Sequence, residues 1–139
     1  MRPIKFRAWI DREMIYPKGD LYIAFFDAPM AVDWAIYNRR TESNFYKHDG
    51  SYPELTESNH LMQFTGLMDK NGKEIYEGDI VRFIDDVTIP SKPDEVITEV
   101  FWWDVMACFS MKNTYMELNF TTVDEIEVIG NIYQNPELL

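Results

Sequence analysis

Apolar and polar residues alternate along the first segment of the chain, from residue 4 to residue 10. The two sides of this alternation are Ile4, Phe6, Ala8 and Ile10 against Lys5, Arg7 and Trp9. A period of two is typical of a β-strand with one buried face. A turn over residues 11–13 would fold residues 14–16 back against this strand, and the apolar run over 21–26 predicts another strand.

The pattern over residues 30–37 fits two kinds of element. Met30, Trp34 and Tyr37 have helical spacing, whereas every second residue from 32 to 36 would lie on one face of a strand, and we favour the strand. Residues 47–60 contain glycine, proline and serine and predict an exposed linker. The sequence therefore predicts two domains. They are an N-terminal β subdomain with its linker, 1–60, and a second domain, 61–139.

The clearest pattern lies in residues 61–83. It predicts two strands joined by a tight turn and then, after a second turn, a third strand. Asp69–Gly72 suits a type I turn closed by a left-handed glycine, because aspartate bonds its own backbone and glycine adopts positive φ freely. The segment Glu77–Phe83 resembles the first strand of many small SH3-like barrels.

A loop and a hairpin are predicted next. Residues 85–95 include two prolines, which cannot donate to a strand ladder, and so predict a long loop. The β-branched and aromatic residues over 96–103 predict a strand. A turn at 104–106 would join this strand to another over 107–111.

The last part of the chain completes the predicted barrel. Residues 116–120 predict a strand, and Thr122–Glu125 has the spacing of a capping box that would begin one helical turn before a final strand over 128–132. Five short strands at this spacing favour a small barrel. The predicted fold class is mainly β, with an N-terminal β subdomain and a C-terminal SH3-like small β-barrel.

Three blocks of the chain resemble one known family. They are Met1–Trp9, Leu61–Phe83 and Glu127–Leu139, with Met14–Tyr16 between the first two. In this order they resemble the YopX family, whose members are small phage and prophage proteins known for their fold rather than for an activity. The resemblance implies a phage-encoded protein and supplies no catalytic, cofactor-binding or metal-binding residue.

Composition fits a soluble, folded chain. The 139 residues are 46% hydrophobic and 15% aromatic, which is too apolar for a disordered chain despite a net charge of −11. Cys108 is the single cysteine, and its apolar neighbours predict a buried small side chain in a reducing compartment. No apolar run has the length of a signal-peptide core or a membrane span. We expect a protein of the bacterial host cytoplasm without membrane contact.

The two halves of the chain differ in charge. Residues 1–60 hold nine acidic and eight basic side chains, whereas residues 61–139 hold fifteen acidic and five basic ones. Because nucleic-acid affinity depends on Lys and Arg displacing counterions, we do not expect the second half to bind nucleic acid. Lys5, Arg7 and Trp9, with Arg39 and Arg40 further on, could contact a single strand of nucleic acid. The first three also fit the polar face of an amphipathic strand.

Neighbouring carboxylates are the main candidates for chemistry. The pairs are Glu77 with Asp79, Asp85 with Asp86, and Asp94 with Glu95. Two pairs brought together could serve acid–base catalysis or bind a divalent ion, but a solvated acidic surface is the simpler interpretation. The turn at Asp69 has its glycine at the wrong position for a calcium loop, and neither histidine has a metal-ligand spacing. We expect no cofactor, metal or catalytic residue.

Tryptophans are the main candidates for protein contact. Trp102 and Trp103 are adjacent in a predicted strand and should point to opposite faces. We therefore expect one of them in the core and the other at the surface, where aromatic side chains are frequent contact residues. The full set of candidate contact residues is Trp9, Trp102, Trp103, Glu77 and Asp79.

Three hypotheses about function follow. The first is a non-enzymatic phage or prophage protein that associates with itself or docks another protein through barrel edges and exposed aromatic residues. The second is an acidic mimic of nucleic acid that occupies the basic groove of a DNA-handling protein. The third is a carboxylate-metal phosphoesterase. The sequence favours the first.

Overall fold

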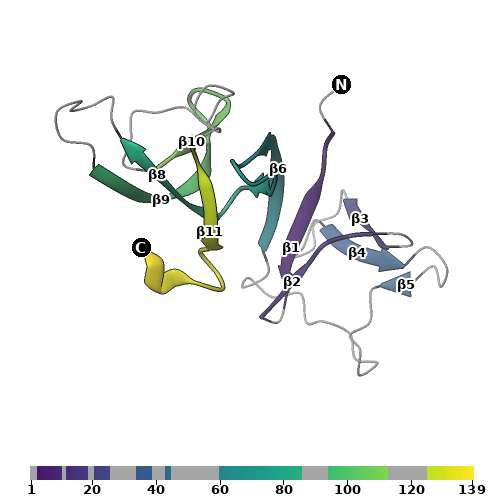
Figure 1. Cartoon of the computed structure of the whole chain (residues 1–139). Helices are drawn as coiled ribbons and strands as arrows, with labels where there is room; N and C mark the ends of the chain where they lie inside the picture. The colour runs from purple at the N-terminus through teal and green to yellow at the C-terminus, as the bar shows by residue number, and fades with distance from the viewer. Residues whose placement is uncertain are drawn as a thin grey trace. The chain divides into compact units, whose positions relative to one another are not determined.

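A computed structural model gives the structure of the chain (Figure 1). It describes residues 3–10, 12–18, 21–25, 34–38, 43–44, 60–85, 94–112 and 125–139. Contacts divide the chain into two compact units: an N-terminal unit, Phe6–Met62, and a C-terminal unit made of Met1–Lys5 with Gln63–Leu139. That residues 1–60 and 61–139 form two domains stays a prediction.

Short antiparallel strands build the N-terminal unit. They are β1 (Phe6–Ile10), β2 (Glu13–Ile15), β3 (Leu21–Phe25), β4 (Trp34–Asn38) and β5 (Ser43–Asn44). Ala8 lies opposite Ile15 in the β1–β2 pair, and Ile23 lies opposite Ile36 in the β3–β4 pair. The apolar core of this unit consists of Ala8, Ile10 and Ile36, with Ile15, Ile23 and Leu61 packed against them.

The remaining strands follow one another from residue 60 to residue 131. They are β6 (His60–Met68), β7 (Glu74–Tyr76), β8 (Asp79–Asp85), β9 (Asp94–Trp103), β10 (Cys108–Met111) and β11 (Glu127–Asn131), and a single 3-10 turn, η1 (Pro136–Leu138), comes after them. Strand β6 begins in the N-terminal unit and ends in the C-terminal unit.

The main sheet of the C-terminal unit has the strand order β10-β9-β8-β11, and all of its pairings are antiparallel. One of the antiparallel sheets of the protein curls into a half-barrel. Along β8, Val81 and Phe83 are buried while Ile84 is exposed, as expected for a strand with one face on a core. The core residues are Leu67, Ile75, Val81, Phe83, Val100, Phe109, Met111, Ile126 and Val128.

A second sheet has the order β2-β1-β6-β7, and the turn between β6 and β7 is the one that the sequence predicts. The Gly72 amide donates to the Asp69 carbonyl at 2.9 Å, and Gly72 has a φ of 78°. Only glycine adopts such a φ without strain, which explains its place at the end of the turn. The predicted turn with a left-handed glycine is confirmed.

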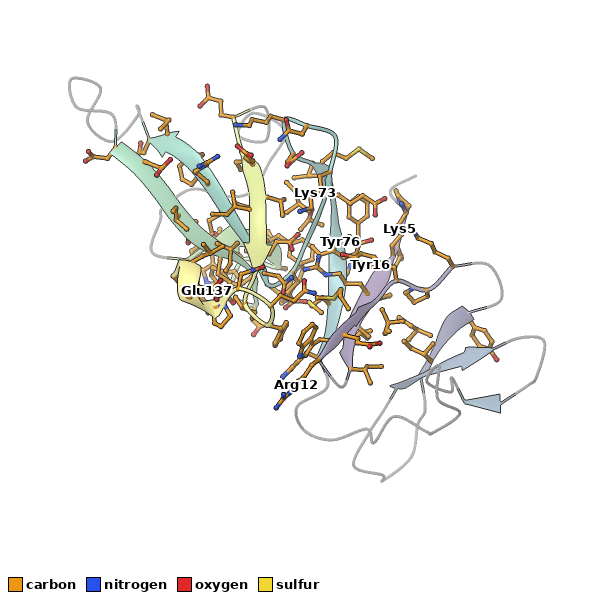
Figure 2. All side chains as sticks on the ribbon, turned by 60° about the horizontal axis from the view of Figure 1, so that its bottom comes forward. Lys5, Arg12, Tyr16, Lys73, Tyr76 and Glu137 are labelled. Carbon is orange, nitrogen blue, oxygen red and sulfur yellow. The ribbon has the colours of Figure 1, made fainter. Side chains whose placement is uncertain are left out.

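The first residues of the chain, Met1–Lys5, belong to the C-terminal unit. Lys5 contacts two strands of that unit (Figure 2). Its carbonyl accepts a hydrogen bond from the Phe64 amide at 2.9 Å, and its ammonium group forms an ion pair with Glu74. The Tyr76 hydroxyl donates to the same Glu74 carboxylate at 2.7 Å. Residues far apart in sequence thus attach the start of the chain to β6 and β7.

The mainly β fold class is confirmed, because the described residues form strands and one 3-10 turn. Residues 34–38 form a strand, as the interpretation of 30–37 favours. Several predicted segments lie outside the described residues. They are residues 47–59 of the linker predicted over 47–60, residues 86–93 of the loop predicted over 85–95, the strand over 116–120 and the capping box up to residue 124. The described ends of the linker and the loop differ from the prediction, because residue 60 begins β6, residue 85 ends β8 and residues 94–95 begin β9.

Two expectations for the first strand are wrong. Ile4, expected on the apolar face, is 76% exposed, because it precedes the first residue of β1. Arg7, expected on the outer face, is only 2% exposed. Alternation shows which residues share a face of a strand, but it does not show whether other parts of the chain cover that face.

No helix in the described ranges is long and apolar enough to cross a membrane.

Candidate protein-interaction site

The hairpin formed by β9 and β10 carries the candidate site. Its strands pair so that Trp103 lies opposite Cys108 and Trp102 opposite Phe109. Four residues connect them, with the Met106 amide donating to the Trp103 carbonyl at 3.2 Å. Ala107 closes the connection with a φ of 50°, a left-handed conformation that is uncommon for a residue with a side chain. The turn predicted at residues 104–106 is confirmed.

Large apolar side chains gather at this hairpin, and we call them the hairpin patch. Val105 is 84% exposed, Met106 is 52% exposed, and Trp102 and Trp103 are each 39% exposed. Turns favour Gly, Asn, Asp, Ser and Pro, so a valine and a methionine at the tip are unusual there. Within the described residues, the patch therefore places four large apolar side chains in contact with solvent over a stretch of five residues.

The two tryptophans do not divide as expected. The ring of Trp102 contacts the buried ring of Phe109 edge to face, with centroids 5.0 Å apart and planes at 72°. Trp103 points to the other side of the strand, yet both side chains have the same exposure of 39%. The expectation that one of them is in the core is wrong. At this end of β9 the core contacts only part of Trp102, so strand alternation does not bury it fully.

Three acidic groups, Glu77, Glu99 and Asp104, lie near one another beside the hairpin patch. Burial raises the pKa of Glu77, and repulsion from Glu99 and Asp104 raises it further, while backbone hydrogen bonds at Gln63 and Trp102 act in the opposite direction. Asp104 itself is exposed in the turn. Glu99 forms an ion pair with a lysine. The hairpin patch therefore lies in a region of negative potential.

The ion pair of Glu99 uses the single basic residue between positions 94 and 112. The Lys112 Nζ lies 2.6 Å from the Glu99 carboxylate. Over the same range the sequence has four acidic residues, so the hairpin keeps a net negative charge after this pairing. Acidic side chains beside an exposed apolar patch can attract a positively charged partner. The patch can then bind the apolar side chains of that partner.

Asp79 lies in the interior, unlike its sequence neighbour Glu77. It is 1% exposed, and its carboxylate accepts a hydrogen bond from the Tyr76 amide at 2.7 Å. This bond closes the tight turn that contains Gly78, whose φ is 76°. Asp79 thus stabilises a turn, and we leave it out of the surface that a partner would contact.

The other candidate residues lie in different places. Trp9 is half-buried in β1, opposite Met14 of β2. Asp94 and Glu95 are exposed at the start of β9, and Asp94 lies opposite Asp85 of β8. In the part of the chain that the structure describes, no group of three His, Cys, Asp or Glu side chains is placed to hold a metal ion.

Val105 and Met106 are candidate contact residues that the sequence predictions did not include. Their signal is present in the sequence, because apolar side chains occupy a predicted turn where no core can cover them. The sequence predicts that Asp69 bonds the backbone of its own turn, but not that its carboxylate also binds the Val128 amide of β11. Asp69 is 6% exposed and binds backbone amides of both its own turn and β11.

Comparisons with known proteins give the family of this chain. The family model described as YopX protein matches residues 5–139. Among solved structures, the crystal structure of protein EF1440 from Enterococcus faecalis is similar, with 27% sequence identity and a TM-score of 0.59. The match covers 100% of this chain and 99% of that one. Curated proteins gave no match. The family match spans almost the whole chain, and the protein belongs to the YopX family.

Proposed function

We propose that this protein is a non-enzymatic phage or prophage protein of the bacterial cytoplasm that binds a protein, either another protein or a second copy of itself, through the hairpin patch. One observation carries the proposal: Val105, Met106 and the two neighbouring tryptophans are all in contact with solvent. Tryptophan and methionine are enriched where proteins bind one another, and isolated surface leucines or valines are not.

Energetics support a role in binding for this hairpin. Burying a side chain such as Val or Met contributes roughly 1.5–3 kcal/mol, and this stabilisation is not used while the side chain faces water. An apolar turn also exposes the protein to unspecific association. A partner that covers the hairpin patch would therefore gain affinity from side chains that contribute little to folding.

The second hypothesis, an acidic mimic of nucleic acid, keeps some support from the charge of residues 61–139. A mimic would bind mainly through its carboxylates, so its affinity would fall steeply with added salt. Binding through the hairpin patch would lose less affinity with added salt, because salt does not screen the burial of apolar surface. Salt dependence therefore separates the two hypotheses. No observation on the described residues favours the phosphoesterase hypothesis.

The test is affinity capture of the tagged protein from phage-infected bacterial lysate at low and at high salt. A patch variant combines Val105→Ser and Met106→Ser. A control variant combines Ile84→Ser and Ile97→Ser, which removes exposed apolar side chains of 49% and 40% exposure outside the hairpin turn. We expect the wild type and the control variant to retain the same protein at high salt and the patch variant to lose it.

Two outcomes would contradict the proposal. Retention of the same protein by the patch variant would show that the hairpin patch is not the binding surface. Retention at low salt alone would favour the acidic mimic. If the tagged protein retained only untagged copies of itself, the self-associating form of the proposal would be the correct one.

A further inference from the structure

We infer that the hairpin patch binds a basic amphipathic segment of another protein, in which Lys or Arg side chains stand next to apolar ones. This inference rests on the proposed function and specifies its partner. It combines two properties that the structure places together at the hairpin: exposed apolar side chains, and the exposed carboxylate of Asp104 with the half-buried Glu77 close to it.

The apolar part of the surface lies at the tip and on the adjoining end of β9. Val105 is the most exposed large apolar residue of the hairpin at 84%, and Met106 next to it is 52% exposed. The indole rings of Trp102 and Trp103 follow directly, each 39% exposed. Methionine adapts its shape to different apolar partners, and indole faces attract cations.

The acidic part of the surface interleaves with these residues. Asp104 stands between Trp103 and Val105 and is exposed, and no ion pair of Asp104 is found in the described part of the chain. Glu77 is close enough to Trp102 to interact with its backbone and to Asp104 to be repelled by it. A lysine or arginine of a partner would relieve this repulsion, since opposite charges at short distance stabilise each other.

A second copy of this chain fits the surface less well than a basic partner. Each copy carries a net charge of −11, and a symmetric contact through the hairpin would bring the same acidic groups of both copies together. Like charges placed against each other across an interface strongly disfavour association. Between positions 94 and 112 the one lysine, Lys112, is already paired with Glu99 and offers no free cation to the other copy.

The experiment measures binding of three labelled peptides by fluorescence anisotropy. In the first, lysines alternate with valines; in the second, glutamates replace the lysines; in the third, serines replace the valines. The protein variants are Asp104→Asn, the double variant Val105→Ser with Met106→Ser, and Asp94→Asn as control. Asp94 is an exposed acid at the other end of β9, roughly 30 Å along the strand at about 3.3 Å per residue.

We expect the lysine–valine peptide to bind the wild type and the other two peptides to bind at least tenfold more weakly. Asp104→Asn should weaken binding of the first peptide about threefold to tenfold, and Asp94→Asn should leave it unchanged. The double variant should lose binding. Thermal unfolding of every variant checks that the fold is intact. We expect the unfolding temperatures to stay close to that of the wild type, because all of the substituted side chains are exposed.

The outcomes separate this inference from the proposed function. If Asp104→Asn binds like the wild type, or if the glutamate or serine peptide binds equally well, the basic amphipathic partner is ruled out. Loss of binding in the double variant would then still support the hairpin patch as an interaction surface. If the double variant binds like the wild type, both fail. If no peptide binds, the inference is overturned, and capture from lysate judges the proposed function separately.

Discussion

Asp69 is the residue whose buried charge contributes most clearly to the fold. Its carboxylate accepts hydrogen bonds from the amides of Asn71 at 2.8 Å, Lys73 at 2.9 Å and Val128 at 3.0 Å. Burial by itself would raise the pKa of Asp69, but these backbone hydrogen bonds, with the charge of Lys73, hold the pKa below its usual value of 3.8. The ionised carboxylate therefore connects the β6–β7 turn to β11.

We predict that Asp69→Asn lowers the free energy of unfolding at pH 7 by about 1–3 kcal/mol. Asparagine has one acceptor oxygen in place of two, so either the Val128 amide or the two turn amides would face an NH2 donor instead of an acceptor. Since the folded state holds the proton of Asp69 less tightly than the unfolded state, its contribution is present above about pH 4 and is lost as the pH falls further. The variant should show a smaller loss of stability between pH 5 and pH 2. Urea unfolding across this range measures both effects.

A control for this prediction is Glu137→Gln, which changes an exposed acid in the C-terminal 3-10 turn (Figure 2). Its stability at pH 7 should stay within about 0.5 kcal/mol of the wild type. An Asp69→Asn variant that unfolds like the wild type at neutral pH, with the same acid dependence, would show that the three hydrogen bonds do not stabilise the fold.

Gly72 allows a direct test of backbone strain in the same turn. Its φ is 78°, and a Cβ atom built there would meet no other atom within 4 Å. Any cost of Gly72→Ala must therefore come from the left-handed backbone and not from a clash. We predict a loss of about 1 kcal/mol in the free energy of unfolding for the alanine variant. Gly72→Asn should lose less, because asparagine adopts this conformation more readily. Equal stability of both variants and the wild type would contradict this account.

At the level of elements, β11 and the segment after it make an unusually close contact. A Cβ atom at Gly130 would lie 2.7 Å from Asn135 Oδ1 and 3.0 Å from Asn135 Cβ. The Asn135 amide also donates to the Asn131 carbonyl at 2.9 Å. Glycine at position 130 thus lets the chain fold back against the end of β11.

We predict that Gly130→Ala destabilises the protein by about 1–3 kcal/mol through this overlap. Asn135→Gly removes the atoms that the new methyl group would meet. The double variant should therefore lose at least about 1 kcal/mol less than the two single variants together. Chemical unfolding of the four proteins in a double-mutant cycle gives this coupling. Strictly additive losses would show that Gly130 and Asn135 do not meet in solution.

Most strands and turns of the described residues were predictable because their signals are local, whereas no pattern predicted β5. The Asp69–Gly72 turn and the hairpin turn after Trp103 each depend on a few consecutive residues. Burial was not predictable in the same way. Arg7 and Asp79 are buried because strands distant in sequence pair beside them, and polar side chains give no sign of this before the pairing is known.

The candidate site was predictable in part. Trp102 and Trp103 are recognisable as contact candidates from their residue type and their adjacency. Their equal exposure depends on where the core ends along β9, which the sequence does not reveal. The interaction of Glu77 with Glu99 and Asp104 depends on the packing of β7 and its turn near the hairpin, which is also a long-range property. Val105 and Met106 could have been identified from their position in a turn.

At the scale of the whole molecule, charge opposes association between copies. A net charge of −11 on 139 residues keeps copies apart over the Debye length, which is roughly 30 Å at 0.01 M salt and about 3 Å at 1 M. Attraction between hairpin patches does not depend on charge in this way. Self-association and binding of a basic partner should therefore respond to salt in opposite directions.

We predict that the wild type is monomeric at 0.01 M salt and that its dimer fraction rises at 1 M salt, because screening removes the repulsion while apolar attraction remains. Sedimentation equilibrium at equal protein concentration measures this change. The variant with Val105→Ser and Met106→Ser should stay monomeric at both salt concentrations, whereas Ile84→Ser with Ile97→Ser should behave like the wild type. A dimer that weakens with salt would mean that charged groups hold the copies together, and equal association of the Val105 and Met106 variant would place the contact elsewhere on the surface.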